Sequence, residues 1–114
     1  MAGLKRVTCK LGKRISWTAR HWESIVKKHD ALARLADDAL ARLADEVAVT
    51  LQRPCYIRAS REDDCVLLYY APYGKYYFCA VCRHLNGDGF LITAYLTDRI
   101  KKGDTIYEAD PHHL

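Results

Sequence analysis

Hydrophobic residues in the middle of the chain gather in short runs rich in aromatic and β-branched side chains, which are typical of β-strands. Three such runs follow one another at 65–70, 76–85 and 90–97. Residues 71–75 contain a proline and a glycine, and Asn86-Gly-Asp-Gly89 is a strong hairpin signal. Because no helix lies between these strands, we expect them to form an antiparallel meander.

Nearer the N-terminus the hydrophobic positions recur at helical spacing. Between Trp22 and His29 they define one face of a helix over 18–29, and Ser16 or Thr18 is a suitable N-cap. The polar side chains of this segment fall on its opposite face, as in a helix packed against a core.

An eight-residue sequence at 30–37 is repeated letter for letter at 38–45. Its alanines and leucines favour a second helix over 31–52, either continuous or bent near Asp37, and Pro54 ends it. The repeat is too short to be a solenoid unit. We therefore interpret it as lengthening a helix without creating a site.

The remaining segments complete the predicted fold. Residues 1–14 form a lead-in, in which 4–11 is either a short edge strand or irregular chain. Residues 55–60 and 105–108 are predicted strands, and 109–114 a frayed tail. The whole chain is then one α+β domain, with two N-terminal helices packed on a four- to five-stranded antiparallel sheet. The second face of that sheet stays free.

Composition supports a folded domain: 50% of the 114 residues are hydrophobic and 28% are charged. No apolar run reaches the ~18 residues that span a bilayer, and the N-terminus has no apolar signal core. We therefore expect a cytoplasmic protein without a membrane partner. The net charge is +4, and the first 28 residues carry a basic cluster of eight side chains against the single acid Glu23. This cluster is either a solvated face or a surface that meets a polyanion. Its members are Lys5, Arg6, Lys10, Lys13, Arg14, Arg20, Lys27 and Lys28.

The five cysteines do not predict a disulfide framework, because their number is odd. Cys79 and Cys82 have metal-like spacing, but residues three apart in a strand point to opposite faces. We interpret the cysteines as small buried thiols and expect no metal and no cofactor.

Pairing Leu85 with Phe90 across the second turn assigns the side chains to two faces. The more polar face, which we expect to be open, carries Phe78, Ala80, Cys82, His84, Leu91, Thr93, Tyr95 and Thr97. The face expected to be the core carries Cys79, Val81, Arg83, Phe90, Ile92, Ala94 and Leu96. Histidine, arginine, lysine, tyrosine and threonine beside a sheet suit metal-independent RNA cleavage, which needs a base, an acid and cations.

Several segments resemble the phage-associated nuclease-like domains of the barnase–EndoU–colicin–RelE (BECR) group. They are Trp17-Thr-Ala-Arg-His-Trp-Glu-Ser-Ile25, Lys28-His29, Thr50-Leu-Gln-Arg-Pro54 and Ile92-Thr-Ala-Tyr-Leu-Thr97. The resemblance covers about 15–107 and implies two N-terminal helices followed by an antiparallel sheet. It also implies metal-independent RNA cleavage in toxin or phage-conflict settings. The family often has His-Pro-Glu where this chain has His29-Asp30-Ala31.

Carried onto this sequence, the resemblance implies the catalytic set His21, Arg58, Arg83, Thr93 and Tyr95. His21 would be the general base or acid, Arg58 the phosphate clamp, and Thr93 and Tyr95 phosphate ligands or proton donors. Arg83 is included although the predicted register turns it toward the core, and His29 is assigned a structural role. Further candidates for RNA binding are Lys13, Arg14, Arg20, Lys75 and His84.

The predicted function is an endoribonuclease-like domain that cleaves RNA through attack of the 2′-hydroxyl. The alternative is a catalytically inactive RNA- or protein-binding domain of the same fold. The expected partners are RNA and a possible protein inhibitor.

Overall fold

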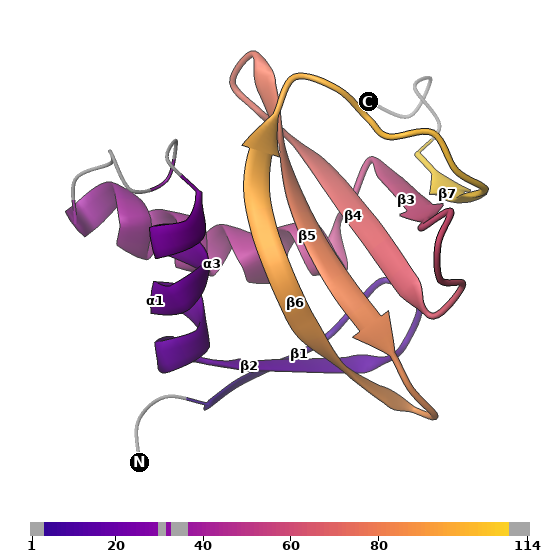
Figure 1. The fold of residues 1–114 in the computed structure, drawn as a ribbon, viewed down its shortest axis with the longest axis horizontal. Coiled ribbons are helices and arrows are strands. Elements are labelled where there is room, and N and C mark those ends of the chain that lie inside the picture. The colour runs from indigo at the N-terminus through magenta and orange to yellow at the C-terminus, as the bar shows by residue number, and fades with distance from the viewer. Residues whose placement is uncertain (1–3, 30–31, 33–36, 110–114) are drawn as a thin grey trace.

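The described residues form one seven-stranded mixed sheet and two helices (Figure 1). This computed structural model describes residues 4–29, 32 and 37–109. In chain order the elements are β1 (Leu4–Thr8), β2 (Arg14–Thr18), α1 (Ala19–Lys28), α3 (Asp37–Gln52), β3 (Tyr56–Ala59), β4 (Val66–Tyr73), β5 (Tyr76–His84), β6 (Asp88–Thr97) and β7 (Thr105–Glu108). The strand order across the sheet is β1-β2-β6-β5-β4-β3-β7. Neither described helix is long and apolar enough to cross a membrane.

The predicted fold class is wrong in two respects. The sheet has seven strands instead of four or five, and it is mixed because β2 runs parallel to the first residues of β6. Both β1 and β2 precede the helices, so the helices are not the first elements of the chain. In β2 the side chains of Ile15 and Trp17 are buried while Arg14 and Thr18 are exposed, an alternation too short to stand out in the sequence.

The local elements agree better with the sequence. The predicted meander is confirmed, because β4, β5 and β6 are consecutive antiparallel neighbours. The first helix is also confirmed: Thr18 is its N-cap, and the Thr18 side chain accepts a hydrogen bond from the backbone N–H of His21 at 3.0 Å. Parts of the repeat and the end of the predicted tail, at 30–31, 33–36 and 110–114, lie outside the described residues.

Both helices pack on the same face of the sheet, which we call the covered face. In the view of Figure 1, α3 passes behind the strands and α1 lies beside β6. Side chains from both helices and the sheet form one buried cluster, which includes Trp22, Ile25, Val47, Leu51, Ile57, Phe78, Ala80, Cys82, Leu91 and Ala94. The opposite face, which we call the open face, carries a smaller cluster of Leu68, Tyr70, Cys79 and Val81. The prediction that Cys79 and Cys82 point to opposite faces is therefore confirmed, and burial raises the pKa of the Cys79 thiol to about 12.

A β-bulge in β6 decides which side chains reach the open face. Cys82 pairs with Leu91, but the preceding Val81 pairs with Thr93, so Ile92 is an extra residue. Leu91 points to the covered face, whereas Ile92 and Thr93 both lie on the open-face side. Beyond the bulge, alternation brings Tyr95 to the open face as well.

The predicted register between β5 and β6 is therefore wrong. Arg83, not Leu85, pairs with Phe90, and the bulge shifts the pairing once more. Phe78, Ala80 and Cys82 were expected on the open face but are buried beneath the helices. Thr93 and Tyr95 were expected to share a face with these three residues. They do lie on the open face, but their neighbours there are Cys79 and Val81.

Candidate functional site

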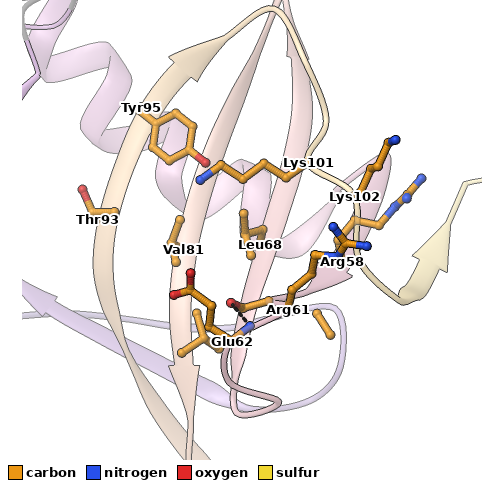
Figure 2. Close-up of a pocket in the computed structure, with 12 residues that line it drawn as sticks. Arg58, Arg61, Glu62, Leu68, Val81, Thr93, Tyr95, Lys101 and Lys102 are labelled. Atoms are coloured by element: carbon orange, nitrogen blue, oxygen red, sulfur yellow. Dashed lines mark hydrogen bonds between the residues drawn. The ribbon is translucent and has the colours of Figure 1, made fainter.

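One row of partner residues crosses the open face from β6 to β3. Thr93 pairs with Val81, Val81 pairs with Leu68, and Leu68 pairs with Arg58. The two middle side chains are apolar and buried, and the two outer ones are polar and partly exposed. Neighbouring strands lie about 4.8 Å apart, so the row spans roughly 14 Å. This row is the floor of a hollow (Figure 2).

The hollow has a volume of about 320 Å³ and is rich in positive charge. Its cations are Arg58 on β3, Arg61 just after β3, and Lys101 and Lys102 in the loop before β7. We call it the cationic trough. A shallower hollow of about 530 Å³ continues from it past Asp104, and shares Arg58, Arg61 and Lys102 with it. The lining of the trough also holds one carboxylate, Glu62.

Three contacts fix the loop that carries the two lysines. The hydroxyl of the buried Tyr70 accepts a hydrogen bond from the backbone N–H of Lys101 at 3.0 Å. The backbone N–H of Ala59 donates to the carbonyl of Asp104 at 2.9 Å. Gly103 packs so closely on the carbonyl of Ala59 that a Cβ at this position would overlap it. The lysines are therefore presented by an anchored loop.

His29 reaches the β6 end of the trough from the C-terminal end of α1. Its Nε2 atom is hydrogen-bonded to the Thr93 Oγ1 at 2.9 Å, and its ring centroid lies 5.8 Å from that of Tyr95. The sequence predicted a structural role for His29 and gave the catalytic imidazole to His21. In the structure it is His29 that contacts residues of the trough.

Two polar groups in the trough are shielded from solvent without a hydrogen-bond partner among the described residues: Arg58 Nε and the Tyr95 hydroxyl. Burial raises the pKa of the Tyr95 phenol well above its usual value, so this group stays protonated and is a hydrogen-bond donor. Figure 2 shows the Tyr95 hydroxyl and the Lys101 amine directed toward each other, and the Lys101 Nζ lies 5.7 Å from the centroid of the Tyr95 ring. Unpaired buried polar groups are costly, and an anionic ligand would satisfy them.

Of the five predicted catalytic residues, the structure brings together Arg58, Thr93 and Tyr95. His21 lies apart from them, and its Nε2–H donates to the carbonyl of Ile92 at 2.9 Å. Arg83 lies on the open face but forms an ion pair with Asp63 outside the lining of the trough. The backbone N–H of Cys65 and this arginine together lower the pKa of the Asp63 carboxyl.

The residues predicted to bind RNA lie outside the trough. Arg14 forms an ion pair with Asp88 at 2.8 Å, and Arg20 is exposed in the first turn of α1. Lys75 lies in the turn after β4, with its Nζ 6.0 Å from the ring centroid of Tyr76. Lys13 lies in the turn before β2, close enough to His84 to affect its titration.

Sequence reasoning missed Arg61, Lys101 and Lys102, although Lys-Lys-Gly after the meander was a visible basic signal.

His84 belongs to a buried network beside the covered face. The Tyr69 hydroxyl donates to Cys9 Sγ at 3.0 Å, and it therefore accepts from the Nε2–H of His84 at 2.9 Å. Burial, and secondarily the positive charge of Lys13, lower the pKa of the His84 imidazole below 6.5. His84 is thus held neutral by a structural contact.

We expect the free energy of unfolding to fall as the pH drops below about 6.5, because the unfolded chain then binds a proton that folded His84 resists. The His84 part of this loss should be under about 1 kcal/mol, since the imidazole is half-exposed. His84→Gln keeps a donor for Tyr69 and removes the titration. Urea unfolding at pH 7.5 and 5.5 should therefore show a smaller pH effect in H84Q, and an identical effect would contradict this assignment.

The comparisons with known proteins identify no relative of this chain. No protein-family model, no curated protein and no solved structure matches it. Within residues 4–29, 32 and 37–109, no three His, Cys, Asp or Glu side chains are grouped so that they could hold a metal ion. The functional argument therefore depends on the geometry of the cationic trough.

Proposed function

We propose that the cationic trough binds an RNA strand and that the chain cleaves it by attack of a 2′-hydroxyl on the adjacent phosphate. The observation that carries this proposal is the row across the open face, with the His29–Thr93 pair at one end and the Arg58 guanidinium at the other. Guanidinium and ammonium groups form strong charge-assisted hydrogen bonds with phosphate oxygens. The resemblance to the BECR group points to the same chemistry.

The proposed step transfers three protons and exchanges one P–O bond for another. The 2′-hydroxyl passes its proton to Thr93 Oγ1 while Thr93 passes its own proton to His29 Nε2, and the 2′-oxygen bonds to phosphorus. The bond from phosphorus to the 5′-oxygen breaks, and the Lys101 ammonium gives that oxygen a proton. The products are a 2′,3′-cyclic phosphate and a 5′-hydroxyl. The Tyr95 hydroxyl donates a hydrogen bond to the oxygens of this phosphate as negative charge develops, and Arg58, at the other end of the row, binds another phosphate of the same strand.

Cleavage of a short RNA by the purified protein in EDTA tests the proposal directly. We expect fragments that end in a 2′,3′-cyclic phosphate, and affinity that falls steeply with salt because phosphate contacts release counterions. RNA that is shifted but intact would indicate the alternative, a binding domain without catalysis. RNA that is neither bound nor cleaved at low salt would refute both functions.

Lys101→Arg separates the charge of Lys101 from its proton. Arginine keeps the positive charge but does not give up a proton near neutral pH, so we expect cleavage to fall roughly tenfold to a hundredfold while RNA affinity changes less than about threefold. Lys75→Arg is the matched control, since Lys75 also lies over a tyrosine ring but outside the trough. Equal cleavage by K101R and wild type would exclude Lys101 as the proton donor.

A further inference from the structure

We propose that a second hollow, next to the cationic trough along β6, holds one unpaired base of the RNA strand; this inference rests on the proposed function. The hollow has a volume of about 380 Å³ and lies where β1, β2 and the start of α1 meet β6. Its apolar walls include Leu4, Trp17, Phe90 and Ile92. We call it the apolar hollow.

The apolar hollow exposes side chains that a folded domain usually buries. Leu4 is 59% exposed and Phe90 is 42% exposed, and Trp17 forms a largely buried wall beside them. A ring that is accessible in a hollow of this size can stack on the flat face of a nucleobase. Such stacking is favourable for every base and needs no sequence-specific hydrogen bond.

The apolar hollow and the trough are separated by a single peptide unit. Ile92 lines the hollow and Thr93 lines the trough, and consecutive Cα atoms are about 3.8 Å apart. The bulge turns the side chains of Ile92 and Thr93 to the same side of the sheet. The hydrogen bond from His21 to the Ile92 carbonyl connects this part of β6 to α1. A strand whose phosphate lies at the His29–Thr93 pair therefore has its next base within reach of Phe90.

The charge around the apolar hollow favours nucleic acid over an apolar peptide. Arg6 pairs with Ser16, a residue of the hollow, and Arg20 precedes His21, which also lines it. Both arginines are exposed. Cations beside a flat apolar surface match the alternation of phosphate and base along a single strand.

A binding experiment with oligomers that cannot be cleaved tests the inference. The probes are a fluorescein-labelled 2′-O-methyl hexauridylate, in which the attacking hydroxyl is blocked, and the same backbone without bases. Wild type should bind the complete hexamer more tightly than the abasic one. Phe90→Ala should weaken binding of the complete hexamer about tenfold and so remove most of this advantage. Phe90→Leu, which keeps apolar volume but lacks a ring, should do the same, and Phe90→Trp should restore the advantage.

Tyr76→Ala is the matched control, because Tyr76 is 45% exposed and lies at the far end of β5. It should keep the full advantage of the complete hexamer. If wild type binds both hexamers equally, or if F90A and F90L keep the advantage, the apolar hollow does not hold a base, although the proposed function stands. If wild type binds neither hexamer at low salt, the proposed function itself fails.

Discussion

Replacing His29 with alanine is expected to lower the rate of RNA cleavage between about 10²- and 10⁴-fold, the usual contribution of a general acid–base group. The reason is geometric: the His29 Nε2 is 2.9 Å from the hydroxyl of Thr93, and Thr93 lines the trough. RNA affinity should change little, because the cations that hold phosphate remain. Single-turnover cleavage of a short RNA in EDTA measures the rate, and fluorescence anisotropy with a 2′-O-methyl RNA measures the affinity.

Substitutions at Thr93, His84 and His21 make this test specific. Thr93→Val removes the hydroxyl that passes the proton and should lower the rate as H29A does, while Thr93→Ser should retain most of it. His84→Gln removes an imidazole that lies outside the trough and should cleave like wild type. A hundredfold loss in His21→Ala, with H29A at the wild-type rate, would return the catalytic role to His21.

Sequence reasoning predicted the elements whose signals are local. The meander of β4, β5 and β6 follows from residue type and turn chemistry, and α1 follows from helical spacing after a good N-cap. The pairing of β2 with β6 has no such signal. It joins residues more than 70 positions apart, and its three parallel pairs leave no mark in either strand alone.

The candidate site was predicted in part because its residues depend on two tertiary features. Arg58, Thr93 and Tyr95 do meet on the open face, but Phe78, Ala80 and Cys82, which were assigned to the same face as Thr93 and Tyr95, lie beneath the helices, because the turn register differs by two residues from the predicted one and a bulge at Ile92 then shifts it by one. Lys101 lies in a loop without periodicity, and its position depends on a hydrogen bond to the buried Tyr70. Propensity and periodicity describe neither feature.

Phe78→Ala is expected to lower the free energy of unfolding by about 3–5 kcal/mol, a large part of the 5–15 kcal/mol that holds a typical domain together. Phe78 is fully buried in one cluster with Val47 and Leu51 of α3, so its removal leaves a cavity between helix and sheet. Urea unfolding followed by circular dichroism measures the loss.

Tyr77→Ala is the control, because Tyr77 is the preceding residue of β5 and lies on the open face. It is half-buried, and its main aromatic contact is an edge-on packing against Tyr70 at 6.4 Å, so we expect a loss under about 2 kcal/mol. A loss in Y77A as large as in F78A would mean that the open face contributes to stability as a covered core does. A smaller loss would instead show that Tyr77, at the margin of the open-face cluster, contributes less to stability than Phe78 does beneath the helices.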